Sequence, residues 1–303
     1  MSDGIQGRFI WHELITTDKT SAAGFYSNVA RLKTQAAPSD STYTMFVASG
    51  QPIGGLLDVA VMGGPPNWLS FITTTHVDDT ARQAESLGAK ILRGPMDLPN
   101  GSRAGILQDP QGAVFAIWSS KNPYQLPATV PLGGMSWHEL ATTDSAAAFS
   151  FYQQLFGWHE TSSMDMGPQG VYRMFGPAGA NDPFGGMYTK APGSPGGPNW
   201  LPYIKVADAR PATATAKKNG AQILNGPMQV PGGGWISMGI DPQGAMFAVH
   251  SIAPAAPAKR AQKRAAHAKR KAATKKKRTI TKNVAKKKAA KKSAPRRAKR
   301  KAG

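Results

Sequence analysis

The sequence contains no cysteine, which excludes disulfides, thiolate metal sites and cysteine nucleophiles. No apolar run approaches the roughly 20 residues that a membrane-spanning helix needs. The first residues also lack the cationic stretch, apolar stretch and small-residue cleavage site of a secretory signal. We therefore expect a cytoplasmic protein without a transmembrane segment.

Acidic residues are missing from the last fifty positions. After residue 253 the chain has 22 of its 37 Lys and Arg residues and no Asp or Glu. The other 15 basic residues are balanced by all 17 acidic ones, so the formal net charge of +20 belongs entirely to the tail. This segregation indicates a near-neutral body with a basic appendage, rather than a fold with a generally basic surface.

The first 250 positions contain an internal repeat. Five segments recur in the same order, at an offset that drifts from 126 to 132 residues. The matched pairs are WHELITTD at 11–18 and WHELATTD at 137–144, FY at 25–26 and 151–152, PNWL at 66–69 and 198–201, ILRGPM at 91–96 and ILNGPM at 223–228, and DPQGAVFA at 109–116 and DPQGAMFA at 241–248. Chance does not produce five ordered matches of this kind, so the body is a duplication.

Within the second copy, local signals predict the elements. Asp144 is suited to cap a helix over 145–156, and Gly157 is suited to end it. A second helix is expected over 208–219, before Gly220. Strands are expected at 137–142, around 172–175 and 185–188, and at 200–206, 223–224, 236–240 and 246–250. In the first copy Gly24 lies inside the first helix, and we expect no clear helix end within 29–41.

Each copy thus predicts two strand–helix–three-strand modules. The predicted fold class is α+β, with four βαβββ modules in two tandem domains and a disordered basic tail. The predicted boundaries are 1–122 for the first domain, 123–133 for the linker, 134–253 for the second domain and 254–303 for the tail.

These modules and their motifs resemble the vicinal oxygen chelate superfamily, which includes glyoxalase I, bleomycin-resistance proteins and extradiol dioxygenases. The hallmarks are FY at 151–152 with LFGW at 155–158, GPM at 226–228 and DPQGAMF at 241–247. The resemblance covers residues 9–250, and the tandem glyoxalase-like proteins of actinobacterial type are the nearest match. It implies two glyoxalase-like domains, each with a cleft that in many members holds a divalent ion.

The metal ligands that the resemblance implies are missing here. In metal-using members one ligand, usually His, lies seven residues before the helix-capping Asp, and another, usually Glu, lies seven residues after the Asp of the Asp-Pro turn. This sequence has Trp11 and Trp137 at the first position and Ala116 and Ala248 at the second. Indole and methyl groups do not bind divalent metals, so we predict no metal site and no cofactor.

Two nearby groups leave a metal-dependent alternative open. His12 and His138 are one residue away from the ligand position, so strand alternation sends their rings to the opposite face, where we expect them under the covering helix with a satisfied N–H. Glu139 and His250 share the parity of the ligand positions and are expected to face the second cleft. A lyase or dioxygenase that uses this unusual pair is the enzyme alternative, although metal sites normally need three or four protein ligands.

The predicted ligand-binding residues lie in these two clefts. Trp11 with Glu13, and Trp137 with Glu139, are spaced i, i+2 on the inward face of each first strand. An aromatic wall with one carboxylate suits a small, partly apolar ligand with a cation or a hydrogen-bond donor. The full predicted set is Trp11, Glu13, Ala116, Trp137, Glu139, Ala248 and His250. In the competing interpretation the tryptophans fill the clefts and each Glu pairs with an Arg or a backbone amide. No catalytic nucleophile is identified.

The tail is rich in Ala, Lys, Arg and Pro and has no aromatic residue, so it cannot bury enough apolar surface to fold alone. It resembles linker-histone tails and the basic tails of actinobacterial histone-like proteins. We expect it to bind DNA or RNA phosphates without sequence specificity and to make the protein nucleoid-associated. The predicted contacts are Lys275, Lys276, Lys277, Arg278, Lys286, Lys287, Lys288, Lys291, Lys292, Arg296, Arg297, Lys299, Arg300 and Lys301. A solubilising role and an anchor to anionic lipid are the alternatives.

Together these observations predict a glyoxalase-like, metal-independent small-molecule-binding protein that its tail tethers to nucleic acid. A purely architectural DNA-associated protein, with clefts filled by Trp, is a third alternative. Both a monomer and a homodimer are compatible with the sequence.

Overall fold

The computed structural model describes residues 5–38, 40–120 and 126–252. The predicted tail and its basic residues lie outside them. The first repeat contains β1 (Phe9–Thr16), α1 (Lys19–Ala30), β2 (Lys33–Ala37), β3 (Asp40–Ala48) and β4 (Gln51–Asp58), then a short α2 (Val59–Met62), and then β5 (Asn67–Thr73), α3 (Val77–Ser86), β6 (Lys90–Asp97), β7 (Ser102–Gln108) and β8 (Val114–Ser120). The second repeat contains β9 (Met135–Thr142), α4 (Ser145–Phe156), β10 (His159–Asp165), a 3-10 turn (Gly167–Gln169), β11 (Val171–Gly176), β12 (Gly185–Thr189), β13 (Asn199–Lys205), α5 (Ala209–Lys218), β14 (Gln222–Gln229), β15 (Trp235–Ile240) and β16 (Met246–Ser251). The four predicted βαβββ modules are confirmed.

The helix ends show how the sequence sets these boundaries. Asp144 accepts hydrogen bonds from the amides of Ala146 and Ala147 at the start of α4, and Gly157 ends that helix in the left-handed conformation, as predicted. The expectation that α1 has no clear end is wrong. Arg31 takes the left-handed conformation with φ 58°, its N–H donates to the carbonyl of Ser27, and the N–H of Leu32 donates to that of Tyr26. A non-glycine residue thus ends α1. Left-handed backbone is usually adopted by glycine, and the sequence has no glycine at this position to mark the end of the helix.

Each repeat forms one eight-stranded sheet. The strand order is β2-β3-β4-β1-β5-β8-β7-β6 in the first and β10-β11-β12-β9-β13-β16-β15-β14 in the second. The two modules of a repeat meet through their first strands, since β1 pairs antiparallel with β5, and β9 with β13. The central strands of a sheet are therefore the first and last strands of its modules, on which the predicted cleft residues lie.

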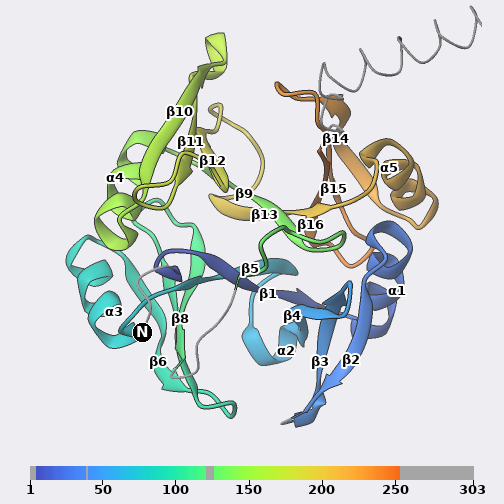
Figure 1. Cartoon of the computed structure of the whole chain (residues 1–303), viewed down its shortest axis with the longest axis horizontal. Coiled ribbons are helices and arrows are strands. Elements are labelled where there is room, and N and C mark those ends of the chain that lie inside the picture. Colours follow the sequence, from blue (N-terminus) through green and yellow to red (C-terminus); the bar gives the residue numbers. More distant parts are fainter. Residues whose placement is uncertain (1–4, 39, 121–125, 253–303) are drawn as a thin grey trace, which may run out of the picture. The chain divides into compact units, whose positions relative to one another are not determined.

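Helices of the two repeats lie side by side in pairs (Figure 1), and the hydrophobic core is shared between the repeats. One cluster joins the β5–β8 module and α3 to the β9–β12 module and α4. The other joins the β1–β4 module and α1 to the β13–β16 module and α5. Helices α1 and α5 lie side by side, as do α3 and α4. The sheets thus pack through their helix-bearing faces, and the opposite face of each sheet is left to form a cleft. In the described part of the chain, no helix is long and apolar enough to cross a membrane.

Candidate functional site

The repeated motifs form the interface between the repeats. The hydroxyl of Tyr152 in α4 donates to Asp109 Oδ2 of the first repeat at 2.9 Å, and Trp200 Nε1 donates to the same hydroxyl at 2.8 Å. The symmetric set places Tyr26 Oη 2.9 Å from Asp241 Oδ2 and Trp68 Nε1 3.1 Å from Tyr26 Oη. The FY, PNWL and Asp-Pro-Gln-Gly segments are therefore explained by contact between repeats, and not by a ligand.

Each aspartate in this interface also shapes its own turn. Asp109 Oδ1 accepts from the amides of Gln111, Gly112 and Ala113 at 2.8–3.0 Å. Burial raises the pKa of Asp109, and the hydrogen bonds from the turn amides and from Tyr152 oppose that rise. Burial is also the largest cause of the raised pKa of Tyr152. The phenol therefore stays protonated and keeps its donor role.

His12 and His138 point away from the clefts, as strand alternation predicts, but they do not lie under a helix. His12 Nε2 lies 2.9 Å from His138 Nε2, so the two rings meet between the sheets. His138 Nδ1 lies 3.2 Å from the carbonyl oxygen of Phe184. Nδ1 of His12 faces the carbonyl of Ile53, but no hydrogen bond of good geometry joins them. The expected satisfied N–H is thus replaced by a histidine pair, because the equivalent strands of both repeats face each other.

In the second cleft Glu139 is held by two tyrosines. Tyr172 Oη donates to Glu139 Oε2 at 2.9 Å, and Tyr203 Oη donates to Oε1 at 2.8 Å. Trp137 Nε1 in turn donates to Tyr172 Oη at 2.9 Å. Burial raises the pKa of Glu139, and the hydrogen bonds from Tyr203 and Tyr172 lower it. The competing interpretation expected an Arg or a backbone amide as the partner of Glu139, whereas the observed partners are phenols.

The first cleft repeats this arrangement with fewer groups. Trp11 Nε1 donates to Glu13 Oε1 at 2.8 Å and lies 3.2 Å from Tyr43 Oη, and Tyr43 also donates to Glu13 Oε1. Phe71 occupies the position that corresponds to Tyr203. Within the described residues Glu13 Oε2 is buried without a partner. Burial is the largest cause of the raised pKa of Glu13.

Sequence reasoning missed the tyrosines Tyr43, Tyr172 and Tyr203. The signal for two of them was a glycine pair that recurs in the repeats, at 54–55 and 185–186. A Cβ on Gly55 would lie 2.0 Å from Tyr43 Oη, and a Cβ on Gly186 would lie 2.3 Å from Tyr172 Oη. The glycines leave room for the phenols to lie across the neighbouring strand.

The predicted ligand positions come together across the central strands. Trp11 is paired with Phe71 and Phe71 with Ala116, and likewise Trp137 with Tyr203 and Tyr203 with Ala248. Ala116 and Ala248 are fully buried in small apolar clusters at the base of each cleft.

This donor set does not fit a divalent cation. In the part of the chain that the structure describes, no three His, Asp or Glu side chains lie close enough to share an ion. His250 is not placed beside Glu139. Its Nδ1 lies 3.0 Å from Ser136 Oγ, while both oxygens of Glu139 are bonded to tyrosines.

The second cleft contains a cavity of about 150 Å³. Its lining is Glu139, Ala141, Tyr188, Lys190, Ser194, Pro195, Asn199, Leu201, Met238 and Met246. Lys190 Nζ donates to the carbonyls of Pro195, Gly196 and Gly197 at 2.6–3.2 Å, which fixes the loop at the rim. The half-buried Glu139 is the only acidic group in this lining.

The first cleft is closed by α2. Val59 and Met62 pack against the cluster of Ile15, Leu69 and Ala116 at its base. Arg93 on β6 reaches across, with Nη2 3.3 Å from the carbonyl oxygen of Val61 and Nη1 3.7 Å from Met62 Sδ. Glu13 below is accordingly 6% exposed. The two clefts therefore differ: one is plugged and the other is open.

Comparison with known proteins agrees with this architecture. The family model described as Glyoxalase/Bleomycin resistance protein/Dioxygenase superfamily matches residues 7–117 and 134–249. The chain is 28% identical over 255 residues to "Putative glyoxylase CFP32" of Mycobacterium tuberculosis (strain CDC 1551 / Oshkosh), which covers 82% of this chain and 96% of that protein. It is 25% identical over 272 residues to "Anthracycline biosynthesis protein DauV" of Streptomyces sp. (strain C5), which covers 82% and 94%.

Two solved structures show the same fold at low sequence identity. The Mn(II)-bound glyoxalase from Novosphingobium aromaticivorans superposes with a TM-score of 0.55 at 16% identity and covers 82% of each chain. An extradiol ring-cleaving dioxygenase from B. fuscum superposes with a TM-score of 0.57 at 16% identity and covers 81% of this chain and 71% of that one. With both repeats matched by one family model and the paired-module sheets in place, this chain belongs to the glyoxalase/bleomycin resistance protein/dioxygenase superfamily.

Proposed function

We propose that this protein is a metal-independent small-molecule-binding member of its superfamily, with its ligand site in the second cleft and a tail that binds nucleic acid. The observation that carries the first part is the cavity above Glu139, whose lining has one tyrosine-held carboxylate as its only acidic group, whereas a metal site normally needs three or four protein ligands. The names of two relatives, a glyoxylase and an anthracycline biosynthesis protein, support a small-molecule ligand.

The lining of the cavity defines the ligand class. Met238, Met246 and Leu201 provide an apolar wall, and Tyr188 adds an aromatic ring. Glu139 is an acceptor whose oxygens still have lone pairs free after both phenols donate. A ligand with an apolar or aromatic body and one amine or hydroxyl group matches these features. At about 150 Å³, the cavity suits a ligand smaller than a drug-sized molecule, for which pockets of ~300–1,000 Å³ are usual.

The enzyme alternative with Glu139 and His250 as metal ligands has less support. Metal sites normally need three or four protein ligands, and in the described part of the chain no group of three His, Asp or Glu side chains lies close enough to share an ion. The architectural alternative accounts for the plugged first cleft but not for the open second one.

A thermal-shift screen with matched variants tests the cleft. Compounds with an aromatic body and one amine should raise the melting temperature of the full chain, because a ligand that binds only the folded state stabilises it by mass action. Glu139→Gln should remove most of this rise, whereas Glu13→Gln, the equivalent change in the plugged cleft, should preserve it.

Metal analysis of protein purified without chelators completes this test. We expect less than stoichiometric Mn, Fe, Ni and Zn. One equivalent of an ion that is lost in Glu139→Ala would contradict the metal-independent proposal, and equal ligand shifts in the Glu139→Gln and Glu13→Gln variants would contradict the site.

For the tail, the support is the segregation of charge. A segment with 22 basic and no acidic residues binds phosphates by counterion release, whatever the base sequence. It has no aromatic residues for stacking on bases, so affinity without sequence specificity is expected. This would associate the protein with the nucleoid.

A further inference from the structure

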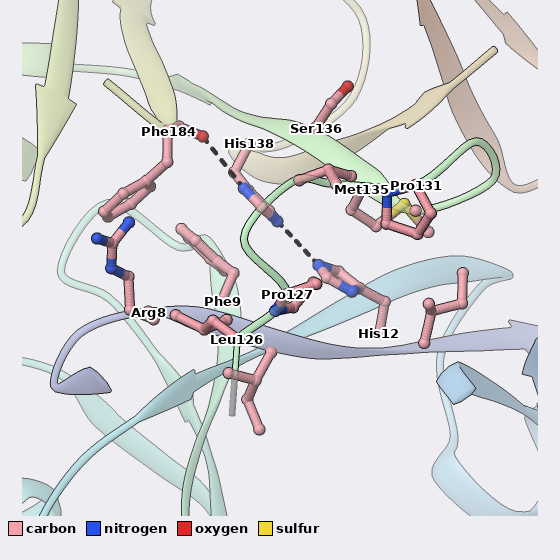
Figure 2. Close-up of a pocket in the computed structure, with 14 residues that line it drawn as sticks. Arg8, Phe9, His12, Leu126, Pro127, Pro131, Met135, Ser136, His138 and Phe184 are labelled. Carbon is pink, nitrogen blue, oxygen red and sulfur yellow. Dashed lines mark hydrogen bonds between the residues drawn. The ribbon is translucent and has the colours of Figure 1, made fainter. Parts of the chain in front are cut away.

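A separate cavity of about 200 Å³ lies between the repeats, on the opposite side of the sheets from the clefts. Figure 2 shows the histidine pair in its wall, with the strand residues of β1 and β9 and the segment before β9 around it. Its volume is several times the ~30 Å³ that one water molecule occupies in the liquid. Nothing in the proposed function of the second cleft involves this space.

The histidine pair has one hydrogen too few to satisfy all four ring nitrogens. A carbonyl oxygen only accepts, so His138 Nδ1 carries a hydrogen toward Phe184. In the neutral pair His138 Nε2 then accepts, and His12 Nε2 donates to it across 2.9 Å. His12 Nδ1 is left as an acceptor that faces another acceptor, the Ile53 carbonyl. One additional proton on this nitrogen would complete the network.

An arginine beside the pair has no counter-ion among the residues that the structure describes. The Arg8 guanidinium lies over the ring of Phe184, with Cζ 5.3 Å from the ring centroid. Its Nε is buried and has no hydrogen-bond partner in the described structure, and the ion pairs found among the described residues do not include it. Arg8, His12 and His138 are the only titratable groups in the lining. The wall therefore offers positive charge and no negative charge.

The remainder of the lining is mostly apolar. Phe9 stacks on His138 with ring centroids 3.9 Å apart, and Phe184 packs edge-on against Phe9. Leu126, Pro127, Val130, Pro131 and Met135 close the other side. A flat apolar body fits such a wall, and an anionic group fits its arginine.

We infer that this cavity is a second ligand site that binds a small organic carboxylate, with Arg8 as its counter-ion and with uptake of one proton by the His12–His138 pair. A bound carboxylate compensates the charge that the pair gains, and the extra hydrogen lets His12 Nδ1 donate to the Ile53 carbonyl. Without an anion the buried pair stays neutral, since burial is the main cause of the lowered pKa of both rings. Carboxylate binding therefore raises the pKa of the pair, and affinity increases as the pH falls through this raised pKa.

Calorimetry on the full chain with benzoate and its neutral isostere benzamide tests the site. Benzoate should bind at least about tenfold more tightly than benzamide, as expected for a charge-assisted contact. Titrations in two buffers of different ionisation enthalpy should show uptake of close to one proton with benzoate and none with benzamide. Equal affinities, no saturable binding of benzoate, or no proton uptake would overturn the inference.

Variants locate the binding. Arg8→Gln should weaken benzoate binding about tenfold or more and leave benzamide unchanged, whereas Arg82→Gln, a change at an arginine whose side chain is 73% exposed, should alter neither. Glu139→Gln in the second cleft should also leave benzoate binding intact, which separates this site from the proposed ligand cleft. In wild-type protein, the ¹⁵N shifts of His12 and His138 should move toward the protonated form on addition of benzoate. Unchanged shifts, or an Arg8→Gln variant with wild-type affinity, would overturn the assignment.

Discussion

At the residue scale, two tyrosine hydroxyls join the repeats. Each donates to a buried aspartate of the other repeat and accepts from a tryptophan of its own. Asp109 and Asp241 are each 3% exposed, so water cannot replace a missing donor. Such bonds contribute more than surface hydrogen bonds, because a buried carboxylate oxygen without a partner retains its full desolvation cost.

Tyr26→Phe and Tyr152→Phe should each lower the free energy of unfolding by about 1–3 kcal/mol, since each change leaves an aspartate oxygen and an indole N–H unpaired. Urea denaturation followed by tryptophan fluorescence measures this loss. Tyr188→Phe is the control, because this half-buried tyrosine makes no hydrogen bond through its hydroxyl among those found in the described structure, and its change should cost under ~0.5 kcal/mol. Equal losses in all three variants would contradict the role of the Tyr–Asp bonds.

The sequence predicted which strand positions share a cleft but not which groups complete it. Strand alternation was sufficient to place Trp137 and Glu139 on one face and His138 on the other. Tyr172 and Tyr203 come from other strands, and their reach toward Glu139 depends on sheet register. Register is a property of pairing, which a single strand does not encode.

At the element scale, the segment after β4 and its counterpart after β12 account for the difference between the clefts. The first forms α2, with Asp58 as its N-cap, whereas Pro192 and Pro195 occur in the second and disfavour a helix. Arg93, which contacts α2, is replaced in the second repeat by Asn225, which is too short to reach across. These differences were visible in the sequence, but their effect on cleft access required the structure.

Arg93→Asn should loosen α2, because the substitution removes the side chain that holds Val61 and Met62 over the first cleft. Hydrogen exchange of peptides that cover residues 59–63 should become faster, while the free energy of unfolding changes by no more than about 0.5 kcal/mol, as expected for an exposed side chain. Arg82→Asn on the surface of α3 should leave that exchange unchanged. Unaltered exchange in Arg93→Asn would show that the packing of Val59 and Met62 alone holds α2 over the first cleft.

Elements whose ends are set by neighbouring residues in the chain could be predicted from the sequence, whereas elements that depend on pairing with other strands could not. α4 begins and ends as its cap residues predict, because capping is local. β10 was not located from the sequence, because six of its seven residues, HETSSMD, are polar or charged. Pairing with β11 provides its hydrogen bonds, so neighbouring strands rather than its own composition make it a strand.

At the scale of the whole molecule, charge divides the chain at residue 253. The family match ends at residue 249, before the basic segment begins. Body and tail should therefore be separable without loss of the fold.

A chain that ends at Ala253 should unfold like the full protein but lose affinity for duplex DNA in ~100 mM salt, a regime in which phosphate contacts dominate. If ~8 tail charges bind phosphates, the full chain should show a log–log salt slope of about −7. Filter binding with two unrelated duplex sequences measures both, and the sequences should bind equally. A truncated chain with full affinity would contradict tethering by the tail.

The reciprocal Tyr–Asp hydrogen bonds between the repeats help to explain how the two clefts came to differ. Each half supplies the donor that the other half's turn requires, which is the isologous arrangement of a two-fold symmetric dimer. In such a dimer of identical subunits, any substitution that plugged one cleft would plug its twin. Covalent fusion of the halves removes that constraint, so a helix and its arginine could close one side while the other stayed open for a ligand.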